Sequence, residues 1–166
     1  METNWLVHNI GDINHSNYTS RQKVANSKGV LTLDGVYLNV YENRDLLDNR
    51  DVILFVMGDY IGGDNTFDLQ HVPRLEKYCT WKQIEEMVDA GAELGWHSWS
   101  HPDLTTLSKE EIIKEITPPF PMKYFSYPYG KYNDLVVECV KEAGYEKAYS
   151  VFQTNNDIWT IPRRYL

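Results

Sequence analysis

Two histidines separated by three residues, His97 and His101, are the strongest candidates for chemistry in this 166-residue chain. They directly follow a short predicted strand, and the turn formers Pro102-Asp103 come after them. Neutral imidazoles are common ligands of zinc and similar divalent ions. A catalytic zinc takes three protein ligands and keeps one position open for water, so a third ligand must come from elsewhere in the chain. A pair of histidines that are exposed on the surface or satisfied by hydrogen bonds is the alternative interpretation.

Two further motifs could contribute to a reaction. Asp34 ends a buried-strand pattern over residues 29–34, where a carboxylate could be a general base, a metal ligand or the N-cap of the next helix. The segment Ser126-Tyr127-Pro128-Tyr129-Gly130 is a sharp turn after another strand. Tyr129 could offer its backbone N–H to an oxyanion and its ring to a substrate. A purely structural turn is the alternative, because Pro and Gly are common turn formers.

The elements that must position these residues follow an alternating pattern of strands and helices. This pattern predicts the α/β class with a mainly parallel sheet. Capping boxes begin two of the helices, with Thr80 and Gln83 in one and Ser108 and Glu111 in the other. A helix is predicted over 37–49, loops over 14–28 and 59–79, and strands over 5–8, 29–34, 51–57, 93–96, 123–127 and finally 146–152. Because working residues in such folds gather at the carboxyl ends of the strands, we expect Asp34, the histidine pair and the Tyr129 turn at one end.

Composition excludes several classes of function. The chain has 16 Lys and Arg against 24 Asp and Glu, a net charge of −8, which disfavours nucleic acid and anionic membrane surfaces as partners. The longest strongly apolar run, over 52–57, is far shorter than the roughly 20 residues of a membrane span. No signal-peptide pattern opens the chain, and two cysteines are too few for a disulfide scaffold, so a cytoplasmic protein is predicted. The length predicts one domain over residues 1–166.

The order of the motifs resembles that of the polysaccharide deacetylase family, carbohydrate esterase family 4. The resemblance extends from about residue 5 to about residue 164 and is most specific over 80–116. It rests on Leu31-Thr32-Leu33-Asp34, on the segment 94–104, on Tyr127-Pro128-Tyr129-Gly130 and on Glu142-Ala143-Gly144-Tyr145. It implies a shortened, irregular (β/α) barrel. It also implies a metal-dependent hydrolase that removes acetyl groups from N-acetylated sugars of a glycan or its precursor.

The resemblance also implies roles for individual residues. His97 and His101 match the two metal imidazoles, and zinc is the ion that the family commonly holds. Asp34 matches the general base, and Tyr129 matches the residue whose N–H serves the oxyanion. Aromatic residues expected to contact the carbohydrate are Trp99, Tyr127 and Tyr129.

The chain departs from the family pattern at three places. Gly35 stands where the family has its metal aspartate, Ser126 stands where many members carry an arginine that orients the base, and no histidine follows His101 as the late general acid. If the first motif slips by one residue, Asp34 becomes the metal ligand and the base is missing instead. A water or one of three carboxylates would have to complete the metal shell, namely Asp59, Asp64 or Asp103.

These departures leave a second hypothesis open. A catalytically inactive relative would keep the fold and an aromatic groove, and would bind glycans without hydrolysing them. A shortened barrel would also expose sheet edges, which a homodimer could cover.

Overall fold

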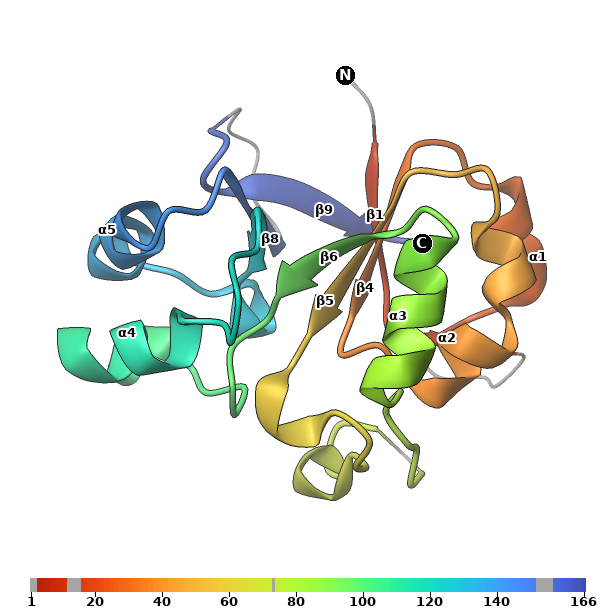
Figure 1. Cartoon of the computed structure of the whole chain (residues 1–166), viewed down its shortest axis with the longest axis horizontal. Coiled ribbons are helices and arrows are strands. Elements are labelled where there is room, and N and C mark those ends of the chain that lie inside the picture. Colours follow the sequence, from red (N-terminus) through yellow and green to blue (C-terminus); the bar gives the residue numbers. More distant parts are fainter. Residues whose placement is uncertain (1–2, 12–15, 73, 152–156) are drawn as a thin grey trace.

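The computed structural model describes residues 3–11, 16–72, 74–151 and 157–166, and its centre is a closed barrel of parallel strands (Figure 1). β9 pairs with β1 and closes the barrel, with Arg164 opposite Trp5. This confirms the predicted (β/α) barrel. The expectation of exposed barrel edges is wrong, so the reason for a homodimer to cover them disappears. The barrel strands, in order, are β1 (Asn4–Val7), β4 (Val30–Asp34), β5 (Val52–Val56), β6 (Glu93–Trp96), β7 (Tyr124–Ser126), β8 (Lys147–Val151) and β9 (Ile161–Tyr165).

Short amphipathic helices cover the outside of the barrel. Both predicted capping boxes are present, at Thr80 with Gln83 and at Ser108 with Glu111. Each of the longer helices buries one apolar stripe, for example Ile112 and Ile116 of α4. Among the described residues, no helix is long and apolar enough to cross a membrane. The α-helices are α1 (Arg21–Asn26), α2 (Leu38–Glu42), α3 (Trp81–Asp89), α4 (Lys109–Ile116) and α5 (Asp134–Glu142).

The structure differs from the sequence prediction in three segments. The loop predicted over 14–28 contains regular structure within its described residues 16–28, because Ser20 caps α1 and β3 (Tyr18–Thr19) pairs in parallel with β2 (Asn9–Ile10). The helix predicted over 37–49 breaks at Asn43 into α2 and a 3₁₀ helix. The strand predicted over 146–152 is β8, and its residue Phe152 lies outside the described residues. β8 is not the last strand, since β9 follows it.

The barrel has two apolar layers. On β5, Val52, Leu54 and Val56 belong to the large cluster that includes the buried helix residues. The alternate residues Ile53 and Phe55 form a separate cluster with Tyr149. Because successive side chains of a strand point to opposite faces, this smaller cluster fills the interior of the barrel.

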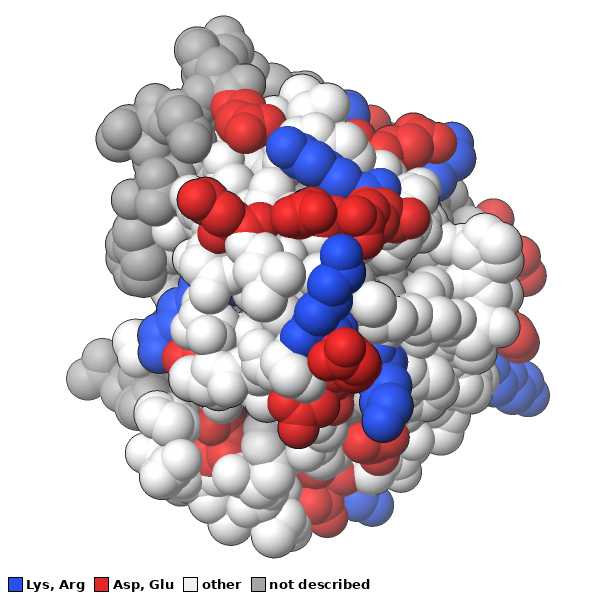
Figure 2. All heavy atoms as spheres, turned by 90° about the vertical axis from the view of Figure 1, so that its left-hand side faces the viewer, with Lys and Arg blue, Asp and Glu red and all other residues white. Residues whose placement is uncertain are grey.

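The outer face over α4 and α5 carries mixed charge. Acidic and basic side chains alternate over this face (Figure 2), and Lys109 pairs with Glu142 at 3.1 Å. Solvent-exposed pairs of this kind contribute little to stability. This face is an ordinary solvated surface, on the outside of the barrel.

Candidate active site

A pocket of about 230 Å³ opens at the carboxyl ends of the barrel strands. Asp34 is the last residue of β4, His97 follows β6, and Tyr129 lies in the turn after β7, and all three line this pocket. His101 lines it as well. The three motifs singled out in the sequence therefore meet at one end of the barrel, where parallel α/β folds place their working residues.

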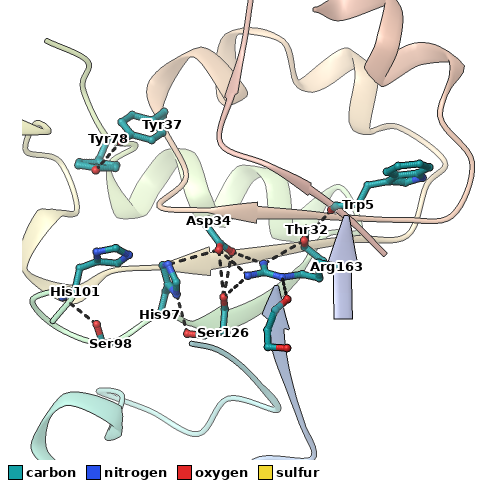
Figure 3. Close-up of polar contacts among 11 residues, drawn as sticks. Trp5, Thr32, Asp34, Tyr37, Tyr78, His97, Ser98, His101, Ser126 and Arg163 are labelled. Atoms are coloured by element: carbon teal, nitrogen blue, oxygen red, sulfur yellow. Dashed lines mark hydrogen bonds and ion pairs between the residues drawn. The ribbon is translucent and has the colours of Figure 1, made fainter. Parts of the chain in front are cut away.

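Asp34 lies at the centre of a buried polar network, between His97 and Arg163 (Figure 3). Arg163 of β9 donates two hydrogen bonds to its carboxylate, Nη1 to Oδ1 at 2.7 Å and Nη2 to Oδ2 at 2.9 Å. The Ser126 hydroxyl lies 3.3 and 3.2 Å from the same two oxygens. Asp34 is therefore no N-cap, and the residue that precedes α2 is Tyr37.

The charge of Asp34 is stabilised although the group is buried. Burial alone would raise the pKa of its carboxyl, but the Arg163 guanidinium, with His97 and a direct hydrogen bond, outweighs burial and holds this pKa well below its usual value. Asp34 is consequently an ionised carboxylate at neutral pH.

The two histidines lie side by side and face Asp34. Their ring centres are 4.8 Å apart. His97 Nδ1 lies 2.7 Å from the Ser126 carbonyl oxygen, so Nδ1 carries the proton and Nε2 presents a lone pair. Burial lowers the pKa of His97, and burial together with the neighbouring His97 lowers that of His101 to about 3. Both imidazoles are therefore neutral near pH 7, which is the form that binds metal ions.

Two features of this pair fit a divalent cation. His97 Nε2 and Asp34 Oδ2 are both acceptors and lie 3.6 Å apart with no proton required between them. His101 Nδ1 is buried and has no hydrogen-bond partner among the described residues. A cation would satisfy such electron pairs, and unsatisfied buried polar atoms are otherwise costly. The residues thus fit a metal ion through two imidazoles.

The turn that presents the histidines is strained and braced. Ser98 and His101 have positive φ angles of 71° and 59°, which cost energy in non-glycine residues and concentrate at functional sites. Glu115 of α4 holds this turn: its carboxylate accepts the Trp99 N–H at 3.0 Å, the Ser100 N–H at 2.9 Å and the Ser100 hydroxyl at 2.7 Å. The histidine pair is therefore oriented by a residue on a different element, which no local sequence signal indicates.

The part of the chain that the structure describes supplies no third ligand beside the two histidines. Among the described residues, no group of three histidine, cysteine or carboxylate side chains is arranged to hold a metal ion. Asp103 instead pairs with Lys131 at 2.6 Å, and Asp64 accepts hydrogen bonds from Thr66. Neither of these, nor Asp59, is among the residues that line the pocket.

The space beside Gly35, which the resemblance matches to the family's metal aspartate, is closely packed. Gly35 has φ +85°, and a Cβ added there would lie 3.1 Å from Tyr78 Cε1 and 3.3 Å from Met57 Cε. Tyr37 stacks on Tyr78 with ring centres 4.4 Å apart, and their hydroxyls are 3.0 Å apart. A tyrosine pair thus occupies the space into which a side chain at position 35 would project.

The three aromatic residues expected to contact carbohydrate have different environments. Tyr129 lines the pocket, is 46% exposed and has φ 58°. Tyr127 is fully buried and donates its hydroxyl to the Trp159 carbonyl. Trp99 packs edge-on against Trp96 and donates its ring N–H to Thr117. The structure therefore brings Tyr129 to the pocket, while Tyr127 and Trp99 support the turns around it.

Sequence reasoning missed two residues of the site. His8, the residue after β1, lines the pocket, and burial lowers its pKa, opposed by the nearby Asp34 charge. Its position at the end of a predicted strand was an available signal. Arg163 offered no such signal, because its contacts with Asp34 depend on the closure of the barrel by β9.

Comparison with known proteins identifies the family. Residues 23–148 match the polysaccharide deacetylase family, and the chain belongs to this family. An uncharacterized 30.6 kDa protein of Geobacillus stearothermophilus is 30% identical over 133 residues, which cover 72% of this chain and 44% of that protein. The chain therefore spans less than half the length of this curated relative.

Solved structures show the same fold. The deacetylase PplD of Streptococcus pyogenes, solved in complex with acetate, superimposes with a TM-score of 0.77 at 15% identity. The superposition covers 99% of this chain and 92% of the PplD chain. IcaB of Ammonifex degensii has a TM-score of 0.75 at 16% identity, with coverage of 100% and 92%. At 15% and 16% identity these likenesses show the barrel fold, and the match over residues 23–148 shows the polysaccharide deacetylase family, carbohydrate esterase family 4.

Proposed function

We propose that this chain is a metal-dependent hydrolase that removes the acetyl group from an N-acetylated sugar of a glycan or glycan precursor. The observation that carries the proposal is the ionised Asp34 carboxylate facing the neutral imidazoles of His97 and His101 in one pocket. His97 and His101 would hold the ion, and zinc is the ion we propose. When bound, it would polarise the amide carbonyl and lower the pKa of a water.

The residues of the chain would move the protons. Asp34 accepts a proton from the attacking water, whose oxygen bonds to the carbonyl carbon of the acetamide. The Tyr129 N–H donates a hydrogen bond to the oxygen that becomes negative. The C–N bond then breaks, and the sugar nitrogen must receive a proton before it leaves as an amine.

His8 is the residue we propose as donor of that proton. No histidine follows His101 in this sequence, and among the described residues of the pocket His8 is the imidazole, besides the metal pair, that the charge of Asp34 reaches. Because burial lowers its pKa, resting His8 is a neutral imidazole, so it would first take up the proton that Asp34 removes from the water and then pass that proton to the sugar nitrogen.

The size of the pocket supports a small reacting group. Its volume of about 230 Å³ is below the roughly 300–1,000 Å³ of pockets that enclose drug-sized ligands. The acetamido group would enter it, and the sugar would lie across the rim against Tyr129 and Phe67, which are 46% and 36% exposed. Phe67 is held by stacking on Tyr60, with ring centres 4.0 Å apart.

The test measures acetate release and metal content together. Protein purified without chelator is incubated with zinc and N-acetylated oligosaccharides, and acetate is quantified by a coupled enzyme assay. We expect about one ion per chain and acetate release, both lost in the double variant His97→Ala, His101→Ala. His71→Ala removes a more exposed histidine at the rim of the same pocket, which pairs with Asp68, and is the control for metal held by the two buried histidines. Acetate release that persists in the double variant would overturn the proposal.

One observation favours a second candidate. Because the Tyr37 and Tyr78 pair fills the space beside Gly35, the chain could instead be an inactive relative that binds glycans. This alternative requires saccharide binding by isothermal titration with no acetate release and no bound metal. Stoichiometric metal with turnover would exclude it.

A further inference from the structure

Arg163 is a fully engaged arginine in the barrel interior. It is 3% exposed and lies on β9, opposite Val151 of β8. The two terminal nitrogens of its guanidinium donate to the two carboxylate oxygens of Asp34, Nη1 to Oδ1 at 2.7 Å and Nη2 to Oδ2 at 2.9 Å. The remaining donors reach the Ser150 carbonyl at 3.2 Å, the Thr32 hydroxyl at 3.3 Å and the Ser126 hydroxyl at 2.9 Å. Arginine has five N–H donors, and all five have an acceptor here.

Stability alone does not account for this arrangement. Desolvating two charges costs about as much as their attraction returns, and well-packed apolar residues in place of a buried ion pair are often neutral or stabilising. The arrangement does, however, fix one carboxylate in space. Arg163 and His97 approach Asp34 from opposite sides (Figure 3). The guanidinium therefore holds the carboxylate on one side, and the other side of the carboxylate faces the histidine pair.

We propose that Arg163 is the positioning residue for Asp34: from the last strand of the barrel it sets the orientation in which this carboxylate meets the attacking water. The inference rests on the proposed function, because it assigns Asp34 a reaction in which orientation matters. Arg163 itself touches no reacting atom.

Ser126 makes this placement possible. It is fully buried on β7, and its short side chain contacts both Asp34 oxygens and Arg163 Nη2. A longer side chain at this position would occupy the volume that the guanidinium now fills. Positions 126 and 163 therefore form a coupled pair, in which either strand could deliver one guanidinium to the same carboxylate.

The test compares two arginines that have similar structural duties. Arg50 is partly buried and also donates to backbone carbonyls, at 2.6 Å to Val24 and 2.8 Å to Ser27, but it does not line the pocket. Arg163→Lys keeps the charge and removes the fork, and Arg50→Lys is the matched control. A misplacement of about 1 Å can cost about 100-fold in rate, so we expect kcat of Arg163→Lys to fall about 100-fold, with KM within about threefold. Arg50→Lys should keep kcat within about twofold.

A relocation variant, Ser126→Arg with Arg163→Ser, supplies the guanidinium from β7 instead. If kcat of this double variant is at least about tenfold higher than that of Arg163→Ser alone, the positioning role is supported. A purely structural role of Arg163 in closing the barrel would not produce this recovery. Circular dichroism and metal content identify any variant that has not folded, and Arg163→Lys then decides alone. If folded Arg163→Lys and Arg50→Lys have equal kcat, the inference is overturned while the proposed function stands. Wild-type protein without acetate release would overturn both.

Discussion

Replacement of Gly35 by alanine or aspartate is predicted to destabilise the protein without creating a third metal ligand. Two costs arise at this position. The backbone has φ +85°, and the left-handed region costs a residue with a Cβ about 1–2 kcal/mol. The new Cβ would lie 3.1 Å from Tyr78 and 3.3 Å from Met57, and overpacking of this kind costs about 1–3 kcal/mol.

Gly144 separates the two costs. It has φ +88° at the end of α5, and a Cβ there would meet nothing within 4 Å. Gly144→Ala should therefore lower the free energy of unfolding by the backbone cost alone, about 1–2 kcal/mol. Gly35→Ala should lower it by about 2–5 kcal/mol, the sum of both costs. The difference between the two variants measures how tightly the tyrosine pair fills the site.

Urea unfolding monitored by tryptophan fluorescence gives both values, and competition with a chromophoric chelator gives the zinc affinity. Gly35→Asp should be at least as destabilised as Gly35→Ala, because it also buries a second carboxylate beside Asp34. Its zinc affinity should not exceed that of the wild type. A Gly35→Asp variant as stable as Gly144→Ala that binds zinc tenfold more tightly would refute the reasoning.

Three further outcomes follow from the contacts of the site. Glu115→Ala should lower the free energy of unfolding by about 2 kcal/mol, because two backbone N–H groups lose their acceptor. It should also weaken zinc binding about 10–100-fold, and the variant Glu110→Ala, at an exposed position of the same helix, is the control. Acidification should destabilise the fold, because the folded pKa of His101, about 3, lies below its unfolded value near 6.5. The contribution of His101 to the free energy of unfolding is fully present above about pH 6.5 and is lost as the pH falls toward 3, by about 2 kcal/mol between pH 7 and 5. Urea unfolding of the His101→Gln variant should therefore show a smaller pH dependence than the wild type. Tyr129→Ala should raise KM about tenfold and change kcat less in steady-state assays, because the ring is lost while the backbone N–H stays. A fall of about tenfold in kcat with an unchanged KM would contradict contact between this ring and the sugar.

Local signals predicted the parts of the fold that depend on neighbouring residues. The capping boxes at Thr80 and Ser108 are present because an N-cap hydroxyl and a side chain three residues later satisfy the same helix end. The apolar run of β5 predicted a strand covered on both faces, and every residue of that strand is buried. Segments with weak periodicity were missed: α1 is polar, and β9 contains Pro162 and two arginines.

The residues of the candidate site also fall into those that local patterns predicted and those that they did not. Asp34, His97, His101 and Tyr129 could be grouped in advance because each follows a strand, and parallel strands end at one edge. The roles of Tyr127 and Trp99 could not be separated from that of Tyr129, because side-chain direction after a turn depends on packing. Glu115 and Arg163 act on the site from distant segments, and no spacing rule connects them with it.

The sequence by itself determined the class of fold, the family and the motifs that carry the chemistry, because these depend on periodicity and on residue types at short spacing. Only the tertiary structure decided that the barrel closes through β9, that Arg163 reaches Asp34, and that the tyrosine pair fills the space beside Gly35. These are contacts between residues far apart in the chain. They depend on strand register and on which volume each side chain occupies, and neither property is encoded in a local pattern.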